Sequence, residues 1–202
     1  MIHDLPRTFV LTVKASQDRH TETMAHLQRQ GINAELFFAF DKFTWACIPD
    51  YTFDVNKVGE RLGWGQCVIC LSHYMLWKVM LHLPGDSFWA LEDDVEFIDD
   101  WRQQYTIAMK HLPEDWDVVF LGSCCAQSRR KWRKGGNVYE IRYPLCGHAM
   151  MYRKKALPVL LDIHQKIWAP LDISMQMDSL PRLRTYTILP RIAAQRGSFT
   201  QP

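Results

Sequence analysis

Three consecutive carboxylic acids, Glu92, Asp93 and Asp94, directly follow a short apolar segment at residues 87–91. The composition of this segment predicts a buried strand. Side chains alternate in direction along a strand, and the chain turns where the strand ends, so one or two of these carboxylates can face a common cleft. Such oxygen ligands suit Mg²⁺ or Mn²⁺, with a ligand's phosphates completing the coordination shell. A solvated acidic turn is the alternative, and the motif alone does not separate glycosyl transfer from phosphoryl transfer.

The charges around this motif are strongly polarised along the chain. Residues 86–117 contain ten acids and two bases, whereas residues 129–155 contain nine bases and one acid. A surface of this kind can bind a metal–phosphate ligand with both signs of charge. The net charge of the whole chain is only +2. The chain as a whole is therefore not strongly basic, although a local basic patch could still bind nucleic acid or acidic lipid.

The predicted elements alternate between strands and helices, which is typical of a parallel α/β sheet. A strand at residues 7–14, a helix that ends near Gln30 and Gly31, and a strand at residues 32–40 form the first β-α-β unit. Residues 41–63 are expected to form a long functional loop, and residues 129–136 a basic surface loop. Further strands and helices are predicted at residues 66–83 (helix), 87–91, 99–111 (helix), 116–121, 138–142, 153–165 (helix) and 185–189.

The size and composition of the chain indicate one globular domain over residues 1–202. The chain opens without a secretory signal, so we expect a cytoplasmic protein whose six cysteines are reduced. Cys67 and Cys70 form a CxxC pair, but they lie in the apolar helix at residues 66–83. We interpret them as small core residues rather than as zinc or redox ligands, and the adjacent Cys124 and Cys125 as structural.

Several short motifs occur in the order found in one enzyme family. They lie at residues 9–19, 31–41 (GINAELFFAFD), 65–73 (GQCVICLSH), 90–95 (ALEDDV), 116–122 (WDVVFLG), 147–156, 170–172 (PLD) and 190–195. On these motifs the chain resembles glycosyltransferase family 25, the lipopolysaccharide and lipooligosaccharide galactosyltransferases and their relatives that glycosylate collagen hydroxylysine. Gln66 stands where the family often has Glu, and no Thr precedes His148.

The resemblance implies a GT-A-like α/β fold, a mostly parallel twisted sheet flanked by helices that binds a nucleotide sugar. It implies transfer of a hexose, galactose or glucose, from a UDP-sugar to an acceptor hydroxyl with inversion. Mn²⁺ or Mg²⁺ would neutralise the leaving diphosphate, held by Asp94 together with Glu92 or Asp93. A glycan, a lipid-linked glycan or a protein hydroxyl would be the acceptor, and a modified nucleic-acid base stays open.

Further residues are expected to contact the donor. Arg19 follows the first strand and is placed to meet the nucleotide or diphosphate, although a surface arginine at a helix start is the alternative. Ser72 and His73 share one helix, and His73 either lines the donor pocket or is a buried core histidine. Asp93 is a further donor contact, and either Gln195 or water completes the metal shell.

Asp172 is the predicted catalytic base. Inversion in one displacement needs a base on the acceptor hydroxyl, opposite the leaving diphosphate. Pro170 is expected to end any preceding helix and set Asp172 on a turn. The alternative is that Asp172 caps a helix that begins near Ile173; Asp178 is the competing base.

A basic run around one tryptophan is a candidate acceptor contact for anionic lipid, glycan phosphate or nucleic acid. It consists of Arg129, Arg130, Lys131, Trp132, Arg133 and Lys134. We expect peripheral contact with the inner face of a membrane through this run, although a solvated loop is the alternative.

Two other functions compete with glycosyl transfer. One is a non-catalytic module that holds a sugar nucleotide or glycan on a degenerate transferase fold, which Gln66 favours and the intact acidic motif opposes. The other is a metal-dependent phosphoesterase, which needs more His and Asp ligands at strand ends than this sequence offers.

Overall fold

The computed structural model describes residues 5–39, 52–53, 64–127, 130–131, 136–141 and 143–196. Their helices are α1 (Gln17–Arg29), α2 (Trp64–His82), α3 (Trp101–His111), α4 (Leu157–Ile163) and α5 (Leu171–Ser174). The main sheet has the order β2 (Ala34–Phe38), β1 (Arg7–Thr12), β4 (Ser87–Glu92), β11 (Ala149–Arg153), β6 (Val118–Gly122), β13 (Thr185–Ile188), β9 (Val138–Glu140), β8 (Arg130–Lys131). Smaller pairs join β3 (Thr52–Phe53) to β12 (Lys166–Ile167), β7 (Cys125–Gln127) to β10 (Tyr143–Leu145), and β5 (Val95–Phe97) to β14 (Ala193–Gln195).

Most strands of the main sheet run in one direction. β1 is parallel to both β2 and β4, and β13 is parallel to β6. β11 lies antiparallel between β4 and β6, and β9 is antiparallel to β13. The predicted α/β class and the first β-α-β unit are therefore confirmed, and β11 is an antiparallel insertion in an otherwise parallel centre.

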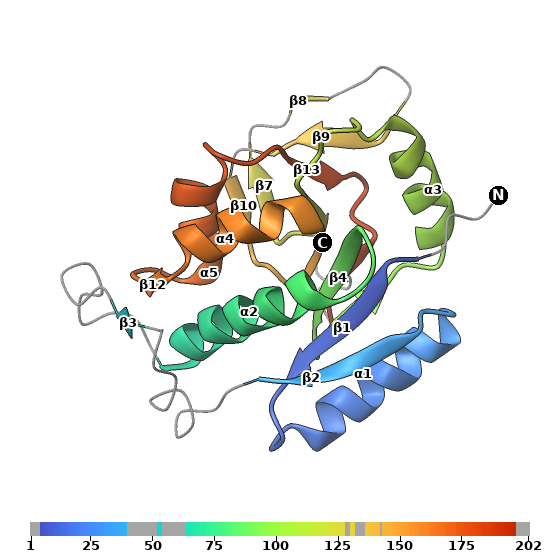
Figure 1. The fold of residues 1–202 in the computed structure, drawn as a ribbon. Helices are drawn as coiled ribbons and strands as arrows, with labels where there is room; N and C mark the ends of the chain where they lie inside the picture. The colour runs from blue at the N-terminus through green and yellow to red at the C-terminus, as the bar shows by residue number, and fades with distance from the viewer. Residues whose placement is uncertain are drawn as a thin grey trace.

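The sheet is covered on both faces, because its central strands are apolar on both sides. In β4, Phe88 and Ala90 pack into one hydrophobic cluster, whereas Trp89 and Leu91 pack into the other. The first cluster includes residues of α2 and α4, which lie side by side in Figure 1. The second includes residues of α1 and α3. Trp89, which is fully buried, anchors it by stacking on the ring of Phe97 at a centroid distance of 5.7 Å.

Three strand ends and one strand start meet at the same edge of the sheet. Leu11 of β1 pairs with Glu92 of β4, so the residues that follow these two strands are neighbours. Ala149 of β11 pairs with both Leu91 and Gly122. The segments after β1, β4 and β6 are thereby brought to the segment just before β11.

Several predicted elements need correction. The helix expected over residues 153–165 is wrong at its start, because Arg153 ends β11, a 3₁₀ turn covers Lys154–Ala156, and α4 begins only at Leu157. Pro158 lies in the first turn of α4, where its missing N–H costs nothing. Only residues 52–53 of the long loop expected over residues 41–63 are described, and the rest of this loop lies outside the described residues.

The expectation that all cysteines are reduced is also wrong. Cys124 and Cys146 form a disulfide across 22 residues, with their Cα atoms 5.6 Å apart. Cys67 and Cys70 are free and buried, which confirms that they are core residues. Among the described residues no helix is long and apolar enough to cross a membrane.

A Gly122→Ala substitution is expected to lower the free energy of unfolding by about 1–3 kcal/mol. A Cβ at residue 122 would lie 2.5 Å from His148 Nε2 and closer still to the backbone carbonyl of Ala193. Urea unfolding measures the difference. Gly65→Ala is the matched control, because a Cβ there meets nothing within 4 Å and should leave stability unchanged or raise it. Equal stability of both variants would contradict the expected clash.

Candidate active site

Two adjoining cavities open at the edge where the strand ends meet. The first, the Arg19 cavity, has a volume of about 250 Å³ and is lined among others by Thr12, Arg19 and Asp93. The second, the Asp172 cavity, has a volume of about 220 Å³. Glu92 and Ile69 line both cavities. Glu92, the first residue of the acidic motif, therefore lies at the junction of two spaces, each with its own set of polar groups.

Asp93 is held in the wall of the Arg19 cavity and is only 7% exposed. Its Oδ2 accepts a hydrogen bond of 2.7 Å from the hydroxyl of Thr12, and its Oδ1 lies 2.5 Å from the guanidinium of Arg19. The hydroxyl of Thr23 in α1 donates to its backbone carbonyl at 2.6 Å. Both oxygens of this carboxylate are thus occupied, which fixes the side chain of Asp93 in the turn after β4.

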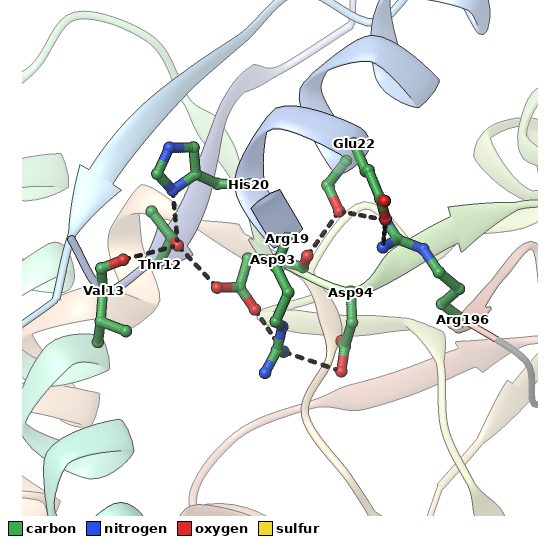
Figure 2. Close-up of polar contacts among 9 residues, drawn as sticks. Thr12, Val13, Arg19, His20, Glu22, Asp93, Asp94 and Arg196 are labelled. Atoms are coloured by element: carbon green, nitrogen blue, oxygen red, sulfur yellow. Dashed lines mark hydrogen bonds and ion pairs between the residues drawn. The ribbon is translucent and has the colours of Figure 1, made fainter. Parts of the chain in front are cut away.

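Arg19 bridges Asp93 and Asp94. Figure 2 shows its guanidinium between the two carboxylates, and Asp94 Oδ2 accepts a hydrogen bond of 3.1 Å from it. Arg19 Nη2 therefore forms ion pairs with both carboxylates. The backbone carbonyl of Asp94 also accepts a hydrogen bond from the backbone N–H of Arg196, which follows β14. The acidic turn is thus tied to the first helix and to the last described strand.

Asp94 offers an oxygen without a partner. Its Oδ1 is buried, and no group among the residues that the structure describes hydrogen-bonds to it. Burial raises the pKa of Asp94, while Arg19 acts in the opposite direction. A buried carboxylate oxygen of this kind is costly unless something compensates its charge.

Glu92, the last residue of β4, carries the most perturbed carboxyl of the motif. Burial, followed by the charges of Asp94 and Asp93, raises its pKa to about 7. The charge of Asp172, which lines the Asp172 cavity, raises the pKa of Glu92 further. The side chain is therefore close to half protonated at neutral pH and would be ionised by any cation placed next to it.

The donor set fits a hard divalent cation. The unpartnered Oδ1 of Asp94 and the carboxylate of Glu92, which lines both cavities, are oxygen ligands in the same acidic motif, and such ligands suit Mg²⁺ or Mn²⁺. Of the two partners expected for Asp94, Glu92 fits better, since Thr12 and Arg19 already occupy both oxygens of Asp93.

Ser72 and His73 both line the Arg19 cavity from α2, although each is only 1% exposed. The hydroxyl of Ser72 donates to the carbonyl of Val68 one turn earlier at 2.6 Å. Burial lowers the pKa of His73 to about 3, so its imidazole is neutral, and its Nδ1 lies 3.5 Å from the hydroxyl of Tyr152. Both readings of His73, cavity wall and core histidine, are therefore compatible with its position.

Asp172 lies in the Asp172 cavity together with Glu92 and Gln195. It is the second residue of α5, after Pro170. Its Oδ2 accepts a hydrogen bond of 3.0 Å from the backbone N–H of Cys146, and its Oδ1 accepts one of 2.9 Å from the N–H of Ile173. Pro170 occupies the N-cap position of α5 without a side-chain cap bond, so Asp172 does not cap a helix starting at Ile173.

Other residues of the predicted set lie apart from these cavities. The competing base Asp178 accepts a hydrogen bond of 2.6 Å from the indole N–H of Trp168 and lines a different cavity. Of the basic run only residues 130–131 are described, as β8 at the edge of the main sheet. The remainder of the run lies outside the described residues, so its role stays a prediction.

Sequence reasoning missed four residues that hold the site together. Thr12 ends β1 and bonds to Asp93, which lies 81 residues later. Thr23 and Arg196 brace the same turn through a hydrogen bond of 2.9 Å between them. Cys146 holds Asp172. The only available signal was Thr12 itself, a polar residue at the end of a predicted parallel strand.

One group of side chains could be taken for a second metal site. Cys124, Cys146 and His148 offer ligand atoms within 4.8 Å of one another. The disulfide occupies both sulfurs, and a thiolate is required to bind a metal. Among the described residues this group therefore holds no metal in its oxidised form.

Comparison with known proteins shows which family this chain belongs to. The sequence matches the profile of glycosyltransferase family 25 (LPS biosynthesis protein) over residues 5–132. The chain belongs to glycosyltransferase family 25. This confirms the resemblance drawn from the motifs, of which those at residues 9–122 lie inside the matched region.

Curated relatives of this family 25 chain are distant. A glycosyltransferase 25 family member of Anopheles gambiae is 24% identical over 65% of this chain and 24% of its own length. Human procollagen galactosyltransferase 2 is 22% identical over 56% of this chain and 20% of its own length. The chain thus spans about a quarter or less of the length of these relatives.

A solved structure supports the fold. A glycosyltransferase involved in the glycosylation of the major capsid of PBCV-1 matches with a TM-score of 0.54 and 10% identity. The match covers 90% of the protein described here and 81% of the PBCV-1-related glycosyltransferase. It confirms the expected glycosyltransferase-like α/β fold and carries no information on substrate.

A Glu92→Gln substitution is expected to change the pH dependence of stability. In the unfolded chain Glu92 titrates near its ordinary pKa of 4.5, and in the folded protein near 7. The folded state therefore binds more protons between these values, so the wild type loses stability relative to Glu92→Gln as pH rises from about 4.5 to about 7. The expected difference is about 1–3 kcal/mol.

Urea unfolding in metal-free buffer at pH 5 and pH 8 measures this difference. Glu114→Gln, which changes an exposed side chain, is the control and should show the same pH dependence as the wild type. A Glu92→Gln variant that also follows the wild type at both pH values would contradict the raised pKa.

Proposed function

We propose that this protein transfers a hexose, galactose or glucose, from a UDP-sugar to an acceptor hydroxyl with inversion, and that Mn²⁺ or Mg²⁺ supports the reaction. The observation that carries the proposal is the pair of cavities that share Glu92. One holds the charged groups that a diphosphate needs, and the other holds a carboxylate that can accept a proton.

The donor is proposed to bind in the Arg19 cavity. Its diphosphate would lie against Arg19, whose planar guanidinium pairs with phosphate oxygens as it does with carboxylates. Asp94 and Glu92 would hold the divalent cation, which when bound neutralises the negative charge that develops on the leaving diphosphate. Asp93 keeps the acidic turn in place through Thr12. Ser72 and His73 would form the floor beneath the nucleotide, and Gln195 or water would complete the shell of the cation.

The acceptor is proposed to bind in the Asp172 cavity. Asp172 would accept the proton of the attacking hydroxyl as the new bond to the anomeric carbon forms. The bond from that carbon to the diphosphate oxygen breaks, and its electron pair leaves with the nucleotide. The hydrogen bonds from Cys146 and Ile173 hold the carboxylate of Asp172 in a fixed orientation, which reduces the reorganisation needed during transfer.

A glycan, a lipid-linked glycan or a protein hydroxyl is the proposed acceptor class. Human procollagen galactosyltransferase 2, whose name gives a protein acceptor, is similar to this chain in sequence, and the matched family profile is described as an LPS biosynthesis protein. The proposed cytoplasmic location and membrane contact through the basic run rest on the sequence alone.

A binding module without turnover is the second candidate. Gln66, an amide where the family often has a carboxylate, lines the Asp172 cavity. If this position normally assists catalysis, the chain would bind a sugar nucleotide without transferring it.

Incubation with Mn²⁺ and a panel of sugar nucleotides separates these functions. Slow release of UDP from one donor supports the transferase, and an acceptor screen with that donor follows. Tight binding of a sugar nucleotide without release supports the binding module. Release of inorganic phosphate from phosphate esters would support the phosphoesterase and contradict both.

An Asp94→Asn substitution is expected to weaken Mn²⁺-dependent binding of the sugar nucleotide at least about tenfold, because a neutral amide is a poor ligand for a hard cation. Isothermal titration with Mn²⁺ present and absent measures the effect. Asp99→Asn removes an exposed acid of the same segment and should bind normally. Undiminished Mn²⁺-dependent binding by Asp94→Asn would exclude this residue as a ligand.

An Asp172→Asn substitution is expected to leave donor binding intact and to lower the transfer rate by roughly 10²-fold or more, because an amide cannot accept the proton. Steady-state kinetics give kcat and the donor KM separately. Asp162→Asn is the control, since Asp162 is exposed and pairs with Arg182. Transfer by Asp172→Asn near the wild-type rate would mean that another group is the base.

A further inference from the structure

The disulfide between Cys124 and Cys146 lies against the Asp172 cavity. Cys124 follows β6, and Cys146 stands between β10 and β11. The backbone N–H of Cys124 donates to the carbonyl of Leu145 at 3.0 Å, so the two segments run together where they are cross-linked. Cys124 is exposed, and a solvent-exposed disulfide is accessible to thiol exchange.

Cys146 has an unusual backbone conformation. Its φ is +65°, the left-handed region that side chains with a Cβ rarely adopt, and among the described residues no other non-glycine residue has a positive φ. In this conformation its N–H donates to Oδ2 of Asp172 at 3.0 Å. The cross-link to Cys124 holds the residue that makes this hydrogen bond.

The other half of the disulfide contacts a second residue that lines the same cavity. Cys124 Sγ lies 3.6 Å from Oε1 of Gln195, and Gln195, Cys146 and Asp172 all line the Asp172 cavity. One covalent bond thus connects a neighbour of the proposed base with a neighbour of the proposed cation site.

We propose that Cys146, held by its disulfide to Cys124, is a positioning residue for Asp172, and that reduction of this disulfide lowers the rate of sugar transfer. The inference rests on the proposed function. Reduction by a dithiol gives two protein thiols, and the dithiol is oxidised to its own disulfide, so electrons and protons balance. Without the cross-link Cys146 relaxes from φ +65° to the common regions, and its N–H leaves Asp172.

The expected effect is a loss in kcat without a change in donor binding. Loss of one hydrogen bond to a charged group corresponds to about a tenfold decrease in rate. The donor KM stays within about twofold, because the Arg19 cavity does not include either cysteine. A cross-link that served stability alone would lower the melting temperature and leave kcat unchanged well below it.

The experiment compares three states of the protein at a temperature well below the melting point of the least stable. They are the oxidised wild type, the wild type reduced with dithiothreitol, and the Cys124→Ser/Cys146→Ser double variant. Alkylation and mass spectrometry establish the redox state of each. The reduced wild type and the double variant should share a kcat about tenfold below that of the oxidised wild type, and reoxidation should restore the wild type.

Two controls test the route of the effect. Dithiothreitol should leave the double variant unchanged, and Cys125→Ser should respond to it as the wild type does. In the Asp172→Asn background, reduction should cause no further loss of the residual rate, because the cross-link acts through Asp172.

Two outcomes would overturn the inference while the proposed function stands. They are a reduced wild type whose kcat equals that of the oxidised protein, and a tenfold loss on reduction that persists in Asp172→Asn. Absence of turnover by the oxidised wild type with every donor overturns the proposed function, and the inference with it.

Discussion

The repulsion among neighbouring carboxylates at one edge of the sheet is the constraint on which the site depends. Glu92, Asp93 and Asp94 are consecutive, and Asp172 adds a fourth negative charge within electrostatic reach of Glu92. Partial burial strengthens this repulsion, since less water screens it. The structure compensates it unevenly: Arg19 and Thr12 contact both oxygens of Asp93, whereas Glu92 holds its proton to higher pH. A site with this excess of negative charge is suited to a cation and to a ligand that carries a bound cation.

The sheet topology explains how these charges come together from distant parts of the sequence. Parallel β1 and β4 end side by side, so Thr12 is presented to the turn that follows β4. The antiparallel β11 begins at the same edge, which brings the Cys146 segment next to that turn. β14 pairs with β5 and delivers Gln195. The supports of the acidic turn are therefore long-range, and most of them are backbone or hydroxyl groups rather than charges.

The parts of the structure that could be predicted from sequence are those with a local signal. The strand before Glu92, the apolar helix α2 and the stop at Gly31, where φ is +65°, each follow from composition or from a residue type at a fixed place. β11 could not be recognised, because Met150 and Met151 face opposite hydrophobic clusters and the segment shows no alternation. The Cys124–Cys146 pairing and the bond from Thr12 to Asp93 depend on tertiary contacts that no local pattern encodes.

The division of the site between two parts of the chain has a consequence for classification. The region of this chain that matches the family profile ends at residue 132, so it covers the acidic motif, Arg19 and α2. Asp172 and Gln195, which line the other cavity, lie beyond it. Two proteins that match this profile equally well can therefore differ in the residues that line the Asp172 cavity. The match therefore covers the residues proposed to bind the donor, whereas the proposed base and much of the wall of the Asp172 cavity lie in residues outside it.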